Sequence, residues 1–164
     1  MIRILNPTED RSDFDRLVSA YSAFLDDQES LKFLSYTLLK FEKKSIEEIT
    51  RKHKERGLDY LVFEKDKKIC GILAYKRNPA IGFELFGLVV DRKEHKAGIG
   101  ETLINECLKI AAEEQYKCID TLVFADNKNM LRLLIKKDFR PIDIIHHSRA
   151  DGMDLIKLRK YLND

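Results

Sequence analysis

Residues 83–115 read FELFGLVVDRKEHKAGIGETLINECLKIAAEEQ. This stretch opens with a short apolar run, residues 85–90, rich in residue types that favour a β-strand. A charged turn with two glycines follows at residues 91–100. Beyond it, apolar residues recur at the spacing of one buried helical face, namely Leu103, Ile104, Cys107, Leu108 and Ala111. The sequence therefore predicts a strand, a glycine loop and a helix in direct succession.

The junction between this strand and helix has the properties of an anion-binding site. The first backbone N–H groups of a helix have no partner inside it, and the helix dipole places partial positive charge there. Gly98 and Gly100 can adopt backbone angles closed to other residues and leave room for a ligand against the main chain. Arg92, Lys93 and Lys96 add positive charge at the same end. We therefore expect a phosphate-bearing cofactor at this loop.

Two common phosphate-binding loops do not fit this stretch. A dinucleotide-binding loop needs G-x-G-x-x-G, but the third residue after Gly100 is Leu103. A P-loop needs G-x-x-x-x-G-K-[ST], and the sequence contains no such run.

The stretch instead resembles the acetyl-CoA signature of the GCN5-related N-acetyltransferases, the GNAT superfamily. In that family a strand of the form E-L-x-x-L-x-V precedes [QR]-x-x-G-x-[GA] at the start of a helix. The matching strand residues are Glu84, Leu85, Leu88 and Val90. The loop reads H-K-A-G-I-G over residues 95–100, with His95 where the family usually has Gln or Arg. Backbone N–H groups that bind pyrophosphate tolerate that change. A plain glycine turn before a surface helix is the alternative interpretation.

A second family motif follows at the expected place. Family members carry N-x-x-A-x-x-L-Y-x-K-x-G-F on a later helix, and the matching residues here are Asn127, Leu133, Lys136 and Phe139. Met130 stands at the Ala position, Leu134 at the Tyr position and Asp138 at the Gly position. The resemblance covers roughly the second half of the chain. It implies an α/β, GNAT-like acyltransferase fold with a mixed, mostly antiparallel central sheet and helices on both faces.

The resemblance also implies acetyl-CoA as co-substrate. The pantetheine arm and thioester would lie along the central strand, the pyrophosphate against the loop, and a residue of the following helix would contact the arm. Carried over by position, the expected cofactor-binding residues are Leu88, Val89, Val90, His95, Lys96, Ala97, Gly98, Ile99, Gly100, Glu101 and Asn127.

The implied reaction is attack on the thioester carbonyl by a primary amine of a small molecule or peptide. It needs an unprotonated amine, an oxyanion donor and a proton for the leaving thiolate. The family often takes that proton from the motif Tyr, but Leu134 has none to give. Tyr36, Tyr75 or a water could replace it, or the thiolate could leave unassisted. Alternatively, the chain is a non-catalytic acyl-CoA-binding or regulatory module on the same fold.

Glu84 is the candidate base. Some family members place there a carboxylate that accepts the amine proton through water. A charged residue at a strand start is an equally good interpretation. His146 and His147 do not predict a metal site, because neighbouring strand residues point to opposite faces.

Composition limits the other classes of function. The 164 residues predict a single domain over 1–164, with 30 basic and 28 acidic residues and a net charge of +2. This balance argues against nucleic acid or a membrane surface as partner, while a homodimer is left open. Three cysteines in apolar runs predict reduced core residues of a cytoplasmic protein. No apolar run is long enough to span a bilayer.

Periodicity predicts the remaining elements. Strands are expected at residues 2–5, 58–64, 69–77, 85–90, 118–124, 139–147 and 153–158. Helices are expected to begin near residues 12, 31, 45, 100 and 127, the second of them spanning 31–41. Strands joined by hairpins and followed by a strand–helix–strand crossover indicate a mixed sheet with helices packed on it.

Overall fold

A computed structural model of the chain describes residues 1–7, 9–26, 32–34, 36–37, 43–80, 82–95 and 97–162. Its helices and strands are β1 (Ile2–Leu5), α1 (Arg11–Phe24), α3 (Lys43–Glu55), β2 (Leu58–Lys65), β3 (Lys68–Asn78), β4 (Gly82–Val90), α4 (Ile99–Glu113), β5 (Cys118–Phe124), α5 (Lys128–Lys136), β6 (Arg140–Ile145) and β7 (Leu155–Tyr161). A short 3-10 helix, η1 (Arg92–Glu94), lies between β4 and α4. Among the described residues, no helix combines the length and the apolar character that a bilayer crossing demands.

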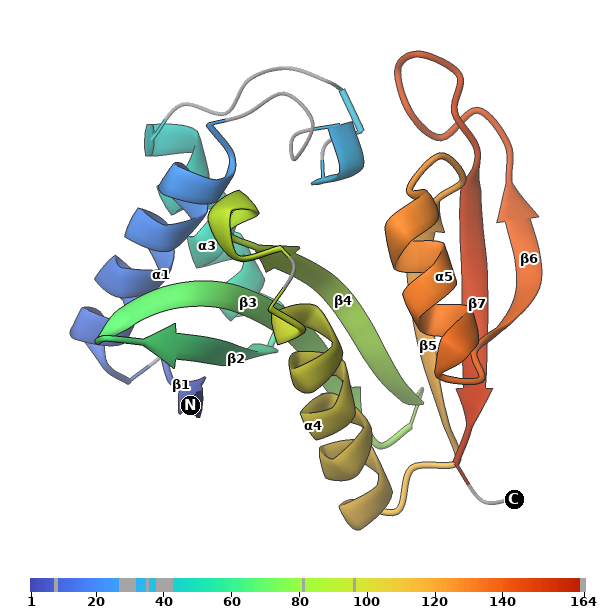
Figure 1. Cartoon of the computed structure of the whole chain (residues 1–164), viewed down its shortest axis with the longest axis horizontal. Helices are drawn as coiled ribbons and strands as arrows, with labels where there is room; N and C mark the ends of the chain where they lie inside the picture. The colour runs from blue at the N-terminus through green and yellow to red at the C-terminus, as the bar shows by residue number, and fades with distance from the viewer. Residues whose placement is uncertain are drawn as a thin grey trace.

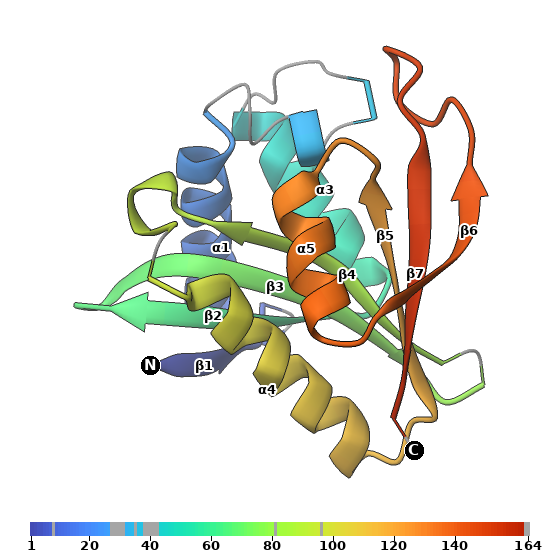
Figure 2. The ribbon, with the colours of Figure 1, turned by 45° about the vertical axis from the view of Figure 1, so that its right-hand side comes forward.

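The strands form a mixed sheet in the order β1-β2-β3-β4-β5-β7-β6 (Figure 1). Neighbouring strands are antiparallel except β4 and β5, which run parallel because α4 carries the chain from one to the other. Helices α1 and α3 cover one face of the sheet, and α4 and α5 lie on the opposite face (Figure 2). The fold confirms the mixed, mostly antiparallel sheet between helices that the two motifs imply.

Each face of the sheet has its own apolar core. Alternate residues of a strand point to opposite faces, so Leu61 of β2 packs with α4 whereas Tyr60 and Val62 pack with α1. The core beneath α4 includes Leu103, Ile104, Cys107, Leu73 and Leu85. Cys70 and Cys107 are buried and carry free thiols, as predicted for core cysteines, whereas Cys118, predicted as a third core cysteine, has a free thiol but is only half-buried.

The sheet opens between β4 and β5. Their parallel pairing covers residues 83–85 of β4 and 119–121 of β5. Directly beyond it β4 contains a bulge: Tyr75 of β3 pairs with Leu85 and Ala74 pairs with Gly87, so Phe86 is an extra residue. From this point the two strands diverge (Figure 1). The divergence creates the space in which the candidate site lies.

Some predicted boundaries were wrong at the C-terminal hairpin. The strand predicted at 153–158 is β7, Leu155–Tyr161, because the charged Arg159 stays in the strand and forms hydrogen bonds of 2.7 and 3.0 Å with Asp120 of β5. The strand predicted at 139–147 is β6 and covers Arg140–Ile145. Of the helix predicted at 31–41, residues 32–34 are helical; residues 31, 35 and 38–41 lie outside the described residues.

The contact between β3 and the start of α4 can be tested at Gly71. A Cβ atom there would lie 2.7 Å from Ile99 Cγ2 and 3.1 Å from Leu103 Cδ1. We expect Gly71→Ala to lower the free energy of unfolding by about 1–3 kcal/mol through overpacking, as measured by urea denaturation. Gly87→Ala is the matched control, because a Cβ there meets nothing within 4 Å. Equal effects of the two substitutions would show that α4 does not pack closely on β3.

Candidate active site

The divergence of β4 and β5 encloses a cavity of about 460 Å³, referred to below as the first cavity. Its walls are residues 85–90 of β4, residues 121–124 of β5, the start of α4 and one side of α5. Figure 1 shows α4 and α5 on either side of this opening. The first cavity is therefore bordered by the glycine loop at one end and by two diverging strands along its length.

The glycine loop has the geometry expected of an anion site. Gly98 has φ of +72° and precedes the first turn of α4 without any side-chain cap. The first backbone bond of the helix runs from the N–H of Thr102 to the carbonyl of Gly98, at 3.0 Å. The N–H groups of residues 99–101 therefore have no acceptor within the helix. A Cβ at Gly100 would lie 3.4 Å from Leu88 Cδ2 and 3.9 Å from Leu133 Cδ2, which places the loop against both β4 and α5.

Most of the predicted cofactor-binding residues lie together at this cavity. Those that line it are Leu88, Val89, Val90, His95, Gly98, Gly100, Glu101 and Asn127. The Ile99 side chain is instead buried in the core, 3% exposed. The N–H of Ala97 donates to the carbonyl of Glu94 at 3.1 Å, so it is already used. Lys96 lies outside the described residues.

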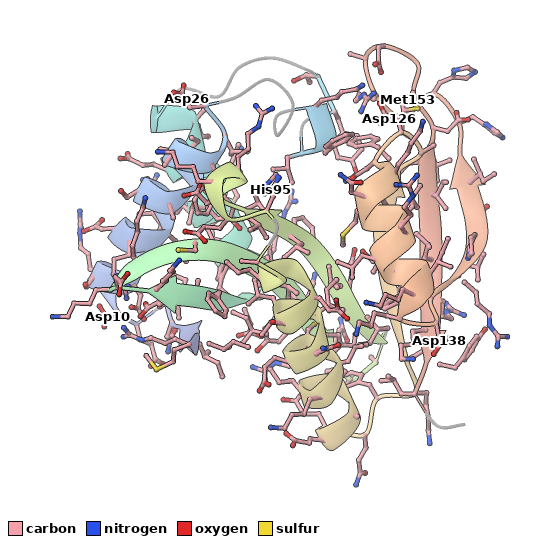
Figure 3. The ribbon with its side chains drawn as sticks, in the orientation of Figure 1. Asp10, Asp26, His95, Asp126, Asp138 and Met153 are labelled. Atoms are coloured by element: carbon pink, nitrogen blue, oxygen red, sulfur yellow. The ribbon has the colours of Figure 1, made fainter. Side chains whose placement is uncertain are left out.

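His95 is fixed at the end of β4. Its Nε2–H donates to the carbonyl of Val90 at 3.0 Å, and Figure 3 shows the residue on the segment between η1 and α4. This bond holds the turn between strand and helix, which is a structural role that a Gln or Arg side chain can also fill. His95, at the position where the family usually has Gln or Arg, thus ties the loop to the end of β4.

Glu101 brings a negative charge to the start of α4, but lysines of α5 neutralise it. Its carboxylate lies 2.7 Å from Lys137 Nζ and 3.2 Å from Lys136 Nζ. The hydrogen bonds from Lys137 and then Lys136 lower the pKa of Glu101. The pair of lysines joins α5 to α4 across the cavity end. An anion at the loop therefore faces a compensated carboxylate.

A second cavity of about 350 Å³ lies on the α1 and α3 side of the sheet. It shares residues 86–89 of β4 with the first cavity, together with Leu122 and Phe124 of β5. The two cavities thus meet where the sheet is open. This arrangement lets two molecules approach each other through the opening from opposite faces.

Glu84 and Tyr36 both line the second cavity. Burial raises the pKa of Glu84. The positive charge of Lys76 lowers this pKa, the negative charge of Asp120 raises it, and the positive charge of Lys157 lowers it. Burial, and then the charge of Glu84, raises the pKa of Tyr36. At neutral pH the arrangement offers a carboxylate with increased proton affinity and a phenol that keeps its proton.

Tyr75 does not line either cavity. Its side chain is 3% exposed, stacks on Phe83 with ring centroids 5.3 Å apart, and belongs to the core beneath α4. The prediction of Tyr75 as a proton donor therefore conflicts with its position. The cause is strand register: Tyr75 pairs with Leu85, and both point to the α4 face.

Leu134 is likewise absent from the cavity wall. It is fully buried, at 0% exposure, and packs in the core beneath α4, whereas Met130 and Leu133 of the same helix line the first cavity. The motif position that holds a Tyr in the family thus lies in the apolar core here. Leu134 therefore presents no proton-donating group to the first cavity.

Sequence reasoning missed an ion cluster around the buried Arg149 beside the site. The Arg149 side chain is 0% exposed and donates to Asp126 at 2.6 and 3.1 Å, to Asp151 at 2.9 and 3.0 Å and to the carbonyl of Lys32 at 2.8 Å. Lys32 Nζ also lies 3.0 Å from Asp126, which Figure 3 shows beside the start of α5. The N–H of Ala150 donates to the carbonyl of Tyr36 at 2.7 Å.

This cluster positions the wall shared by the two cavities. The guanidinium lies 4.9 Å from the centroid of the Phe124 ring, and the Tyr36 ring meets Phe124 edge-on at 5.2 Å. Phe33 and Leu34, next to Lys32, line both cavities. The sequence R-A-D at residues 149–151 was the available indication of this cluster, but the same residues are equally typical of an ordinary hairpin loop.

The chain belongs to the Acetyltransferase (GNAT) family, whose model matches residues 18–139. This confirms the resemblance inferred from the two motifs. Comparison of the sequence with curated proteins gives no significant match.

Solved structures share the fold over nearly the whole chain. An N-acetyltransferase from Staphylococcus aureus Mu50 is 17% identical, with a TM-score of 0.76 over 99% of this chain and 98% of that chain. A ribosomal-protein-alanine N-acetyltransferase from Brucella melitensis is 18% identical, with a TM-score of 0.74 over 99% of each chain. The structure of yncA from Salmonella typhimurium with its cofactor acetyl-CoA is 14% identical, with a TM-score of 0.74 over 100% of this chain and 94% of that chain.

The Arg149 cluster predicts a specific sensitivity to acid. Arg149 lowers the pKa of Asp151 to about 2. Burial alone would raise the pKa of Asp126, but hydrogen bonds from Arg149 and Lys32 outweigh it and lower the pKa. A carboxyl group with a lowered folded-state pKa contributes stability above its unfolded pKa, and that stability is lost as the pH falls through the folded value. We expect the cluster to lose its contribution between about pH 4 and pH 2.

The substitution Arg149→Met tests this assignment. At pH 7 it should lower the free energy of unfolding, because the carboxylates of Asp126 and Asp151 lose their shared guanidinium partner. The difference from wild type should shrink as the pH falls from about 4 to about 2, measured by urea denaturation at each pH. Arg77→Met is the control for the loss of an arginine. Arg77 is exposed and also pairs with two carboxylates, those of Asp59 and Glu114. If the difference in free energy of unfolding between wild type and Arg149→Met does not change with pH, the charge cluster does not contribute to stability in this way.

Proposed function

We propose that this chain is an N-acetyltransferase that moves the acetyl group of acetyl-CoA to a primary amine by direct attack. The observation that carries the proposal is the meeting of two cavities at residues 86–89 of β4. One cavity ends at a helix start with unused N–H groups, and the other holds a carboxylate and a phenol. A thioester entering from one side and an amine entering from the other would meet at the bulge.

The first cavity would hold acetyl-CoA, which would supply the acetyl thioester. The N–H groups of residues 99–101 would bind the pyrophosphate, since orphan N–H groups at a helix start favour anions. Beyond Leu85, the edge of β4 that faces β5 is not paired with it. An extended pantetheine arm can bond to that strand edge in the way a peptide adds to a sheet. Asn127 lines the cavity opposite and caps α5 through a 3.3 Å bond from the Met130 N–H.

Glu84 would act as the base and Tyr36 as the acid. The amine nitrogen forms a bond to the acetyl carbon while the bond from that carbon to sulfur breaks. The amine proton passes to Glu84, directly or through water, and the phenol of Tyr36 gives its proton to the thiolate. The raised pKa of Glu84 favours uptake of the proton, and the raised pKa of Tyr36 keeps the phenol protonated until the thiolate forms.

The core position of Leu134 supports a second candidate, a non-catalytic acyl-CoA-binding or regulatory module. In that case acetyl-CoA binds in the first cavity and no amine is acetylated. A screen of amines with acetyl-CoA, read by the release of free thiol, distinguishes the two candidates. Release that depends on both protein and amine supports the enzyme.

Acetyl-CoA binding can be tested at the glycine loop. A ligand at about 100 times its dissociation constant stabilises the native state by about 2.7 kcal/mol, so saturating acetyl-CoA should raise the melting temperature. Gly100→Asp should abolish this rise by placing a carboxylate next to the pyrophosphate. Gly100→Ala is the steric control, because its Cβ makes ordinary contacts at 3.4 Å or more. If Gly100→Asp binds acetyl-CoA like wild type in calorimetry, the loop is an ordinary turn.

The roles of Glu84 and Tyr36 predict a pattern in the kinetics. Glu84→Gln and Tyr36→Phe should each lower kcat/KM about a hundredfold or more, measured with any acceptor found in the screen. In wild type, activity should fall as the pH drops through the raised pKa of Glu84, because a neutral carboxyl cannot accept the proton. Glu84→Gln should lack that dependence. Tyr161→Phe, an exposed tyrosine on β7 that lines neither cavity, is the control for hydroxyl removal. Unchanged turnover in both variants would exclude proton transfer by these side chains.

A further inference from the structure

The second cavity is apolar on most of its surface. Ile46 and Ile49 of α3 form one side of it. Leu122 of β5, Leu155 of β7 and Phe86 of the bulge form the side toward the sheet. An acceptor that fills this cavity must therefore bury a largely hydrocarbon body.

The polar groups around the cavity are few, and several already have partners. Thr50 lines the cavity, but its hydroxyl donates to the carbonyl of Ile46 at 2.8 Å. Asp120, whose charge acts on Glu84, is held by two hydrogen bonds from Arg159 at 2.7 and 3.0 Å and by Lys157 at 3.5 Å. Among the described lining residues, Glu84 is therefore the one carboxylate that can meet an ammonium group in the cavity.

Among the described lining residues, a second positive charge on the acceptor would find no carboxylate partner besides Glu84. Arg56 lies on the cavity wall and would repel this second charge. An unpaired charge in an apolar cavity is strongly disfavoured, and an unpaired hydroxyl is disfavoured to a lesser degree. The described wall thus discriminates against polyamines and amino sugars and favours an acceptor with one amine.

We infer that the acceptor is a small monoamine with an alkyl or aryl body, whose amine lies at Glu84 and whose body fills the space between α3 and β5. This inference rests on the proposed function and narrows its substrate class. The cavity volume of about 350 Å³ lies in the range of small-molecule sites, about 300–1,000 Å³. Specificity comes from the body of the acceptor, because Glu84 recognises any amine.

Two comparisons among amines test the inference with the wild-type protein. Ethylamine, butylamine and hexylamine should show kcat/KM rising about fourfold per added methylene until the cavity is full. Hexylamine and 1,6-diaminohexane share a six-carbon chain, and the diamine carries a second amine at the far end; hexylamine should be the better acceptor by about tenfold or more. Free thiol release measures both series.

The outcomes separate this inference from the proposed function. If acetyl-CoA binds in calorimetry and 1,6-diaminohexane, spermidine or a peptide N-terminus is preferred over hexylamine, the function stands and the monoamine assignment is wrong. If acetyl-CoA does not bind, or no amine in the series is acetylated, the proposed function fails and the inference falls with it.

A pair of variants tests whether the acceptor preference can be shifted toward a diamine. Ile49→Glu places a second carboxylate in the second cavity without touching the first, and it should shift the ratio of kcat/KM toward 1,6-diaminohexane by about tenfold. Ile135→Glu is the matched control, a helix isoleucine of α5 that is 55% exposed and lines neither cavity. Folded Ile49→Glu protein with an unchanged ratio would show that the acceptor body does not lie against α3.

Discussion

The short parallel pairing between β4 and β5 sets the geometry of the whole site. Hydrogen bonds hold the two strands together over residues 83–85 and 119–121, and the bulge at Phe86 then turns β4 away. A fully paired sheet would leave no route between its two faces. Here each half of the sheet is covered by its own helices, so the opening is lined on both sides by ordered side chains. The opening that both cavities border therefore depends on this incomplete pairing.

The two cavities present different groups to a ligand, and this difference follows from the elements that border them. The loop before α4 offers N–H groups whose direction depends on the backbone, with Gly98 at a φ of +72°. The second cavity takes its walls from α1, α3 and the apolar side chains of β5 and β7. Backbone groups suit a phosphate-bearing ligand common to a family, whereas side chains can change with the acceptor.

The sequence was most informative where chain neighbours are also neighbours in space. The strand, glycine loop and helix of residues 83–115 could be predicted because their elements are adjacent, and Asn127 caps α5 as its position suggested. Tyr75 was misplaced because successive strand residues point to opposite faces: Tyr75 of β3 packs beneath α4, whereas its neighbour Ala74 packs on the α1 side. The Arg149 cluster could not be predicted at all, since Arg149 and Lys32 are 117 positions apart.

That separation along the chain has a consequence for biosynthesis. The wall shared by the two cavities includes Phe33, Leu34 and Tyr36, and the turn at residues 149–151 holds this segment through the Lys32 and Tyr36 carbonyls. A growing chain that has reached α4 already contains the strand, loop and helix that border the glycine-loop end of the first cavity. The segment around Phe33 and Tyr36 stays without its anchor until residue 151 has left the ribosome, because contacts between distant residues form only when both partners are present. The wall that the two cavities share can therefore be completed only after the turn at residues 149–151 has been synthesised.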